Sequence, residues 1–328
     1  MNIAHIVPPD WVGTYKLGAY RMALAHWVFQ YPKYAEQMRK DKSAYILMDS
    51  GSFEDEQVSI GQINEAAEAL KADEVVLPDA PGDSKETLTR SWDALGKIGT
   101  KRVMFVPQGR THEDWCKCLD TWLAQWSKHS WGDSYKLSIG VASLREQNST
   151  KSVTGTKAAL LEEVLDLDYP IHLLGLPHLG NHVKDLLKLA QAGGVRGIDT
   201  STAFALGARG SLVTPIAKKI RLGDPRQYEK LSTSARRLIS LNMRILDDWT
   251  LKGAGGEQIP VHLIRNVASA FLKYYAEGFA ELADVMKACG MPRGRYALTK
   301  QRRREMFVRP LVRFEKLTEK EILVEVKK

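Results

Sequence analysis

The sequence lacks the long apolar runs that a membrane-spanning helix requires, because no stretch of about 18 consecutive apolar residues occurs in its 328 residues. Its first residues, MNIAHIVPPDW, also lack the basic-then-apolar order of a secretory signal peptide. Cysteine is scarce, and the three in the chain, Cys116, Cys118 and Cys289, are too few for a disulfide scaffold. We therefore expect a cytoplasmic protein without a membrane partner.

Acidic residues are sparse at the C-terminal end, which makes the charge distribution uneven. The formal net charge is +8, and residues 291–328 hold twelve Lys and Arg against five Glu. The rest of the chain is therefore close to neutral, and the basic end is the candidate contact for a polyanion.

The basic end also interleaves its cations with aromatic side chains. Arginine neutralises phosphates, and the rings of Tyr296, Phe307 and Phe314 can stack on bases or sugars. The sequence thus predicts nucleic-acid contact here; the alternative is a solvated helix face that keeps the protein soluble. The arginines assigned to nucleic-acid binding are Arg293, Arg295, Arg302, Arg303, Arg304 and Arg309.

A Gly-x-Gly-x-x-Gly motif is absent after the first apolar run, which argues against a dinucleotide-binding domain. Seven short apolar runs alternate with segments of helical periodicity, a pattern typical of a parallel sheet with right-handed crossovers. We predict a TIM-type (β/α)8 barrel, with its eighth strand in SLVTPIAKKI, residues 211–220. The seven runs are 3–8, 44–50, 74–80, 102–108, 137–143, 171–177 and 195–201.

Near Asp224 the pattern of the sequence changes from short apolar runs to long stretches of helical periodicity. Two long helical patterns, residues 231–251 and 260–290, are separated by the loop KGAGGEQIP. They either complete the outer layer of the barrel or form a subdomain. We predict a barrel domain over 1–223, a helical extension over 224–290 and a basic tail over 291–328, without internal repeats or low-complexity segments.

Polar residues stand at several of the predicted strand ends. Asp49, Asp79, Gln108 and Asp199 each follow or close an apolar run. In a barrel the carboxyl ends of the strands meet on one face and form the site. A single acid at a strand end is more often a helix cap or a turn residue, but three acids in equivalent positions favour a site.

The motifs at these strand ends resemble those of the tRNA-guanine transglycosylases and their DNA-modifying relatives. DSGSFE matches an Asp-Ser-Gly-Gly-aromatic-Gln turn, and LPDAP, VPQG, IGVASLRE, HLLGLP and GIDTSTAFALGARG match further motifs of the family. The six matches occur in the family's order over residues 40–210. The resemblance implies a barrel enzyme that exchanges a base in a nucleic acid.

The resemblance gives complementary roles to Asp199 and Asp49, the last and the first of the three acids in the sequence. Asp199 matches the nucleophile, a carboxylate that attacks C1′ of a nucleotide, expels guanine and holds the sugar as an ester. Asp49 matches the acid/base that manages protons on the departing and arriving bases. Two acids that face one small site can separate their titrations, so that one stays ionised while the other holds a proton.

The resemblance also implies a pocket for the base. Asp79 matches the acid that reads the N1–H and amine edge of a guanine-like ring, Gln108 the amide on its carbonyl side, and Phe53 the stacking aromatic. Taken singly, Asp79 is equally well a capped turn, Phe53 a core aromatic, and the glycines of the predicted pocket tight-turn residues. The remaining predicted pocket residues are Gly140, Leu174, Gly175 and the bracing Glu146.

Departures from the family pattern indicate the branch. The family's tRNA-modifying members hold zinc in a Cys-x-Cys-x-x-Cys cluster near the C-terminus, where this chain has only Cys289. Cys116 and Cys118 lie in a helical pattern and do not share a face, so no metal and no other cofactor are expected. The resemblance is therefore greatest to the DNA-guanine transglycosylases that insert 7-deazaguanine derivatives.

The expected partners are DNA and a free 7-deazaguanine base, with a duplex-opening helper protein as a further candidate. Ser52 and Glu54 replace a Gly and a Gln of the family turn, and Val141 replaces a pocket Gly, so the identity of the incoming base is left open. Three alternatives remain: a zinc-less enzyme acting on tRNA, a non-catalytic nucleic-acid-binding partner subunit, and an unrelated barrel lyase or isomerase. His5, His172 and His178 lie near predicted strand ends, and we interpret them as structural hydrogen-bonding residues.

Overall fold

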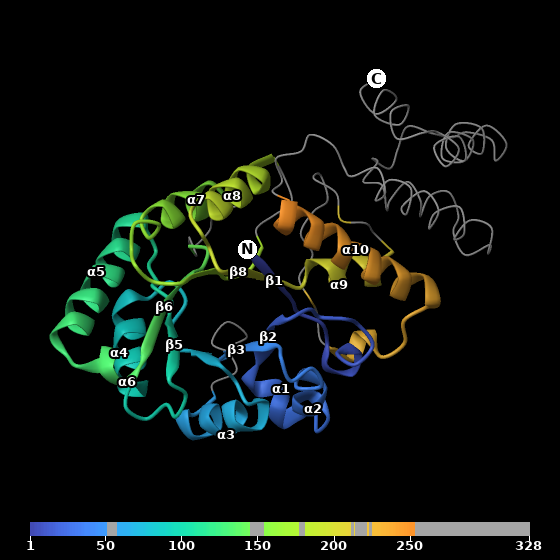
Figure 1. The fold of residues 1–328 in the computed structure, drawn as a ribbon, viewed down its shortest axis with the longest axis horizontal. Coiled ribbons are helices and arrows are strands. Elements are labelled where there is room, and N and C mark those ends of the chain that lie inside the picture. The colour runs from blue at the N-terminus through green and yellow to red at the C-terminus, as the bar shows by residue number, and fades with distance from the viewer. Residues whose placement is uncertain are drawn as a thin grey trace.

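A computed structural model describes residues 1–50, 58–144, 154–176, 181–210, 213, 222 and 225–252 of the chain. It contains a parallel sheet of eight strands in the hydrogen-bonded order β1-β8-β7-β6-β5-β4-β3-β2 (Figure 1). The two ends of that order, β1 and β2, contact each other, so the sheet curls into a nearly closed barrel. The strands are β1 (Asn2–His5), β2 (Tyr20–Leu24), β3 (Tyr45–Asp49), β4 (Glu74–Val76), β5 (Arg102–Phe105), β6 (Lys136–Val141), β7 (Ile171–Leu173) and β8 (Gly197–Thr200).

Helices surround this barrel, as Figure 1 shows. The (β/α)8 barrel prediction is therefore confirmed. In the described part of the chain, no helix combines the length and the apolar character needed to cross a bilayer. The α-helices are α1 (Ala25–Gln30), α2 (Tyr34–Met38), α3 (Ile60–Leu70), α4 (Ser84–Ala94), α5 (His112–Lys128), α6 (Trp131–Ser134), α7 (Thr154–Glu162), α8 (Asn181–Ala192), α9 (Thr202–Ala208) and α10 (Thr233–Lys252).

The longer helices begin where their sequences supply a cap. Ser59 accepts a hydrogen bond from the backbone of Gln62, whose side chain accepts from the backbone of Ser59, a capping box at the start of α3. Asp83 and Thr111 cap α4 and α5 with a single bond each, accepted by the side chain from the backbone N–H of Glu86 and of Asp114. These caps fix the helix starts that the periodicity of the sequence predicted.

Strand alternation divides the core into two layers. One set of side chains, which includes Met22, Leu47, Val76 and Met104, fills the interior of the barrel. The other set faces outward, and there the strands pack against the apolar faces of the helices. Residues that are two apart along a strand therefore share a side, which decides whether a strand-end residue faces the interior.

The sequence-based prediction missed β2 and placed the eighth strand too late. The barrel's eighth strand is β8, and residues 211–220 lie outside the described residues except for Val213. β2 was missed because Arg21 interrupts its apolar run. The Arg21 guanidinium is buried but donates to the carbonyl oxygens of Gly18 and Met38 and pairs with Asp41 at 3.5 Å, so the charge is satisfied inside a strand.

The first of the two predicted C-terminal helical segments belongs to the barrel's outer layer. α10 packs against α9 and β1, and Leu238, Ile239 and Leu246 are buried in the same core as the outward-facing strand residues. The division of the chain into a barrel domain, a helical extension and a basic tail stays a prediction. The second helical segment and the basic tail lie outside the described residues.

Candidate functional site

Asp199 lies inside the barrel near the carboxyl end of β8. Its neighbour Ile198 belongs to the outward-facing core, so alternation turns Asp199 toward the interior, and its side chain is only 9% exposed. The carboxylate oxygen Oδ1 accepts a hydrogen bond from the backbone N–H of Gly175 at 2.8 Å and lies 3.1 Å from Nε2 of His172. Both of these contacts are made by Oδ1, and neither involves the other carboxylate oxygen, Oδ2.

His172 connects Asp199 to a tyrosine deeper in the barrel. The imidazole is completely buried in β7, and its second nitrogen, Nδ1, lies 2.9 Å from the hydroxyl of Tyr20 on β2. Burial raises the pKa of Tyr20 far above its ordinary value, so the hydroxyl keeps its proton. Tyr20, His172 and Asp199 thus form one hydrogen-bonded chain across three strands.

A second polar group lies beneath this chain, toward the amino ends of the strands. Glu74, which is buried, accepts hydrogen bonds from Ser138 and, at 2.5 Å, from Tyr45, and it pairs with Nη2 of Arg196 at 2.7 Å. Burial, the largest single cause, lowers the pKa of Arg196, but the Glu74 carboxylate together with Tyr20 and Tyr45 outweighs it, so the net pKa is raised. The arginine therefore stays charged next to its partner.

Asp49 ends β3 and is half-buried. It stands two residues after Leu47, which faces the barrel interior, so strand alternation gives it the same side as Asp199. Its charge adds to the burial that raises the pKa of Tyr34 on α2. The expected juxtaposition of Asp49 and Asp199 across a base-sized pocket stays a prediction.

Asp79 and Gln108 are brought together by the loops after β4 and β5. Nε2 of Gln108 donates to Oδ2 of Asp79 at 2.6 Å, and Oε1 of Gln108 accepts from the backbone N–H of Gly82 at 3.2 Å. Both residues are buried. The sequence predicted their proximity but not that each end of the amide already has a partner, which makes them a brace between two loops as well as candidates for reading a base.

The predicted residues of β6 and β7 lie along the same wall. A side-chain carbon on Gly140 would come within 3 Å of atoms of Val106, Leu174 and Met104, so the glycine makes room for interior packing. Gly175 adopts φ +73°, a left-handed conformation that favours glycine and that aims its N–H at Asp199.

Lys157 supports this turn from α7. The lysine is completely buried, and its ammonium group donates to the carbonyl oxygens of Leu174 and Gly175, at 2.6 Å for Gly175. The turn after β7 is thereby fixed on both sides, by Lys157 at its carbonyl oxygens and by Asp199 at its N–H. The predicted residues outside the described part of the chain are Phe53, Glu146, Arg293, Arg295, Arg302, Arg303, Arg304 and Arg309, together with His178 and Cys289.

Sequence reasoning missed Tyr20 and Lys157 and assigned His172 only a structural hydrogen bond. Tyr20 was hidden because β2 was not predicted, and Lys157 because a lysine in a helical pattern normally faces water. A signal for His172 was present in the sequence. In HLLGLP it stands two residues before Leu174, so strand alternation places both on the interior side that Asp199 occupies.

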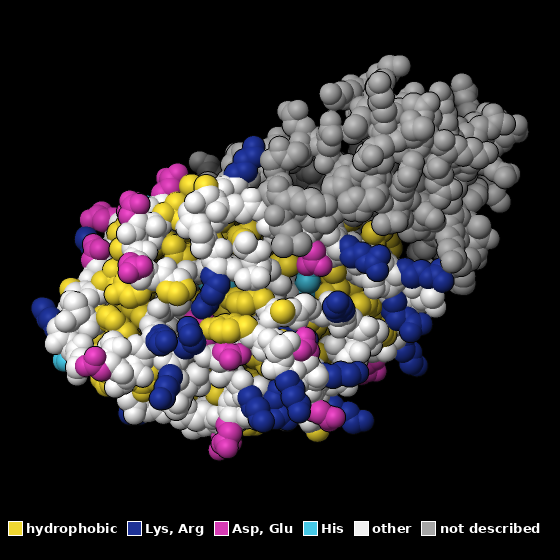
Figure 2. Space-filling model, viewed as in Figure 1, with side chains coloured by type: hydrophobic (Ala, Val, Ile, Leu, Met, Phe, Trp, Pro, Cys, Tyr) yellow, Lys and Arg dark blue, Asp and Glu magenta, His cyan; other side chains and the backbone are white. Residues whose placement is uncertain are grey.

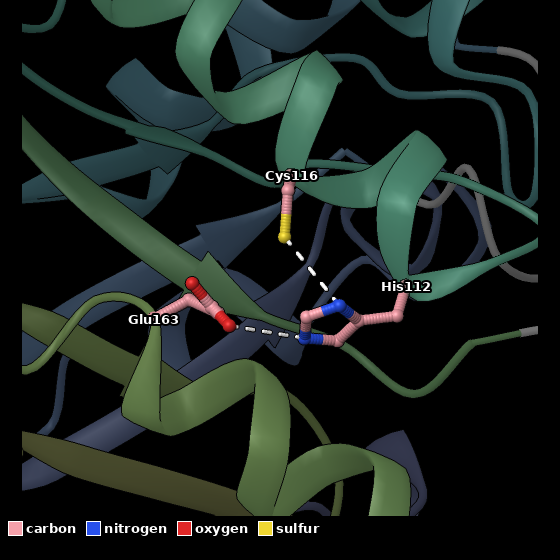
Figure 3. A group of neighbouring side chains, drawn as sticks. All are labelled: His112, Cys116 and Glu163. Carbon is pink, nitrogen blue, oxygen red and sulfur yellow. Dashed lines mark hydrogen bonds and ion pairs between the residues drawn. The ribbon is translucent and has the colours of Figure 1, made fainter.

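A group of possible metal ligands lies on the outside of the barrel. Within the described ranges, one group of three such side chains occurs, His112, Cys116 and Glu163 (Figure 3). Nδ1 of His112 is 3.8 Å from the Cys116 thiol, whereas its other nitrogen, Nε2, is 3.2 Å from Glu163. One ligand atom from each residue lies within 4.8 Å of the other two, but burial and then the Glu163 charge raise the pKa of the thiol, which disfavours the thiolate that a metal ion would bind. The arrangement is that of a surface ion pair.

The surface of the barrel carries charges of both signs. On the described part of the face in Figure 2, Lys and Arg side chains are more frequent toward the lower right and Asp and Glu toward the upper left, with apolar side chains between them. This mixture agrees with the near-neutral composition of residues 1–290 and leaves the C-terminal segment as the place where cationic residues are concentrated.

No protein-family model and no curated protein matches the chain. Among solved structures, it is similar to a phospho-2-dehydro-3-deoxyheptonate aldolase from Thermotoga maritima, with 15% identity and a TM-score of 0.38 over 60% of this chain and 58% of that one. It is also similar to N-acetylneuraminate lyase from Proteus mirabilis, with 11% identity and a TM-score of 0.35 over 96% of both chains. Likenesses this weak carry no argument about activity.

Proposed function

We propose that the protein is a pentosyltransferase that exchanges guanine in DNA for a 7-deazaguanine derivative through a covalent aspartyl-glycosyl intermediate. The observation that carries the proposal is the environment of Asp199. Its buried carboxylate has Oδ1 held by the N–H of Gly175 and by His172, and those contacts leave Oδ2 for an electrophilic carbon. Its place near the carboxyl end of a barrel strand is where barrel enzymes hold their reagents.

The reaction consists of two displacements at C1′. In the first, Oδ2 of Asp199 forms a bond to C1′ while the bond from C1′ to the base nitrogen breaks; guanine leaves with that electron pair and takes a proton from the Asp49 carboxyl group. In the second, the incoming base gives its proton to the Asp49 carboxylate and its nitrogen attacks C1′. The ester bond breaks and the Asp199 carboxylate is restored, with overall retention at C1′ and no need for ATP.

Asp79 and Gln108 are proposed to read the base. The hydrogen bond of 2.6 Å between them orients the carboxylate, which is the acceptor that a guanine-like N1–H and amine edge requires. Since both ends of the Gln108 amide already have partners, its contribution is to hold Asp79 in place or to exchange the contact with Gly82 for the base.

The choice of DNA rests on the C-terminal end of the sequence. Residues 291–328 carry a surplus of seven positive charges, and the zinc cluster of the tRNA-modifying relatives is missing from the sequence. Extruding a guanine from a duplex costs a few kcal/mol, and phosphate contacts by the basic residues would offset that cost.

The test is incorporation of radiolabelled guanine and a labelled 7-deazaguanine into DNA and, in parallel, into tRNA. We expect label in DNA, and we expect Asp199→Asn to reduce the rate by about 10³-fold or more because the amide is not a nucleophile. Asp247→Asn is the matched control. Asp247 also pairs with a buried histidine, His5, but belongs to α10 outside the barrel interior, so its variant should keep the wild-type rate.

The other outcomes identify the alternatives. Label that enters only tRNA would show the zinc-less tRNA enzyme. Binding of nucleic acid without incorporation by the wild-type protein would show the partner subunit. Exchange that survives Asp199→Asn with an unchanged rate would overturn the assignment of the nucleophile.

A further inference from the structure

The hydrogen-bonded chain behind Asp199 extends further than the contacts that a buried carboxylate requires. From Asp199 it passes through His172 at 3.1 Å to Tyr20 at 2.9 Å. Tyr20 stacks on Tyr45 with ring centroids 5.6 Å apart and planes 11° apart. Tyr45 donates to Glu74, so the chain is anchored in the polar group at the base of the barrel.

Room for this chain is made by the glycine that begins β8. A side-chain carbon on Gly197 would lie 2.6 Å from the Tyr20 ring and 3.3 Å from Nδ1 of His172. Gly197 pairs with His172 across the sheet, so the ring of Tyr20 can lie against both strands. The tyrosine ring thus lies close to β8 with its hydroxyl 2.9 Å from Nδ1 of His172.

The positions of the partners determine which nitrogen carries the proton. A neutral imidazole has one donor and one acceptor nitrogen. The Asp199 carboxylate offers only acceptor oxygens, so the imidazole proton is on Nε2, which faces it, and Nδ1 accepts from the Tyr20 hydroxyl, which keeps its proton. The geometry thus gives Asp199 two N–H donors on the same oxygen, one from Gly175 and one from His172.

We propose that His172, held in one tautomer by Tyr20, is a positioning residue that fixes Oδ1 of Asp199 and presents Oδ2 to C1′. The inference rests on the proposed base exchange and extends it to two residues outside the expected site. It also assigns an orientation to the ester, with Oδ2 bonded to the sugar and Oδ1 as the carbonyl oxygen.

The two donors act in both displacements. Before the first, they prevent rotation of the carboxylate, so the oxygen that attacks is the one on the side away from β7. In the second, the bond between C1′ and Oδ2 breaks and its electron pair returns to the carboxylate. The negative charge that develops on Oδ1 is then stabilised by two N–H groups already in place.

The kinetic test measures the rate of base exchange in variants of the residues that form the hydrogen-bonded chain. His172→Phe removes both nitrogens and is expected to lower kcat by about 10²-fold or more with little change in KM for either substrate. His172→Gln keeps an N–H donor near the position of Nε2 and should recover most of that loss. Tyr20→Phe keeps the stacked ring and removes the hydroxyl, for an expected loss of about tenfold.

The matched control is His5→Phe. His5 is as buried as the residues of the hydrogen-bonded chain. It also pairs with an aspartate, Asp247 at 2.9 Å, but on the outer side of the barrel. It should keep the wild-type kcat. A kcat for His172→Phe equal to that of His5→Phe, or no recovery in His172→Gln, would overturn the proposal.

A second measurement separates this inference from the proposed function. The ¹⁵N shifts of His172 in the wild-type protein and in Tyr20→Phe report which nitrogen carries the proton, without any substrate. We expect the Nε2–H form in the wild type and a mixture of tautomers in the variant. If the wild type shows Nδ1–H, the positioning role is wrong; if it shows Nε2–H but no base enters DNA or tRNA, the proposed function is what fails.

Discussion

Single residues in this barrel show how buried polar groups are kept in pairs. Glu74 and Arg196 neutralise each other, and Tyr45 and Ser138 supply further hydrogen bonds to the carboxylate. An isolated charge at this depth would be costly, so the group is stable only as a set. The same reasoning applies to Asp199, which is mostly buried and has its Oδ1 in contact with the N–H of Gly175 and with Nε2 of His172.

Cys118 on α5 provides a prediction about pH. Burial and, to a smaller extent, the charge of Asp79 raise the pKa of this thiol from 9.0 to about 11, although the backbone of Gln108 opposes the shift. The folded protein therefore keeps the proton that the unfolded chain releases above pH 9. This stabilisation is complete below pH 9 and is lost as the pH rises toward 11.

Urea denaturation of wild type and Cys118→Ala at pH 8 and pH 10.5 measures the effect. Between these pH values the wild type should lose about 2 kcal/mol more free energy of unfolding than the variant, because 1.36 kcal/mol corresponds to one pKa unit. The tyrosines titrate in both proteins and cancel in the difference. Equal losses in the two proteins would show that Cys118 is not the source.

Among the elements, β2, β7 and β8 together carry the interior chain, and β2 is the strand that the sequence did not predict. The helices α3, α4, α5, α8 and α10 follow the periodicity of the sequence, and α3, α4 and α5 begin at capping residues. β2 contains a buried arginine whose partners come from elsewhere in the chain, Gly18 and the end of α2. A local pattern could not reveal that compensation, so Tyr20 was not expected at the site.

The contact between β2 and β8 predicts an effect of Gly197→Ala. The added methyl group would meet the Tyr20 ring at 2.6 Å, so either the ring or the strand must shift. We expect a loss of about 1–3 kcal/mol in the free energy of unfolding. We also expect the rate of base exchange to fall by more than the fraction of the variant that is unfolded can explain. Thermal and urea denaturation measure the first, and the incorporation assay measures the second.

Gly61→Ala is the matched control for this substitution. Gly61 is exposed in the first turn of α3, and the nearest atom to the added carbon would be Oγ of Ser59 at 3.9 Å. Alanine is the better helix former, so this variant should be as stable as the wild type or up to about 1 kcal/mol more stable. A Gly197→Ala protein as stable as Gly61→Ala would contradict the close packing of Tyr20 on β8.

The whole molecule combines a nearly neutral barrel with a strongly basic C-terminal end, and this division predicts where DNA affinity originates. Replacing Arg302, Arg303 and Arg304 by glutamine in the full chain should weaken binding to duplex DNA. It should also reduce the slope of log affinity against log salt by about 0.9 for each arginine that contacts a phosphate. Fluorescence anisotropy at several salt concentrations gives both values.

The control removes the same charge from the barrel. Lys33, Lys40 and Lys42 are exposed around α2, and their replacement by glutamine leaves the C-terminal end unchanged. Their variant should keep nearly the wild-type affinity and salt slope. If the two triple variants weaken binding equally, the charge of the whole molecule and not its C-terminal end determines the affinity.

The sequence by itself determined the class of fold, most helices, seven of the eight barrel strands and the placement of acids at strand ends. These features follow from periodicity, capping residues and alternation, which act over a few neighbouring residues. Only the tertiary structure decided that Gln108 braces Asp79, that Gly140 serves packing, and that Tyr20 and His172 stand behind Asp199. Those contacts join strands that are far apart in the chain, and closure of the barrel brings them within hydrogen-bonding distance.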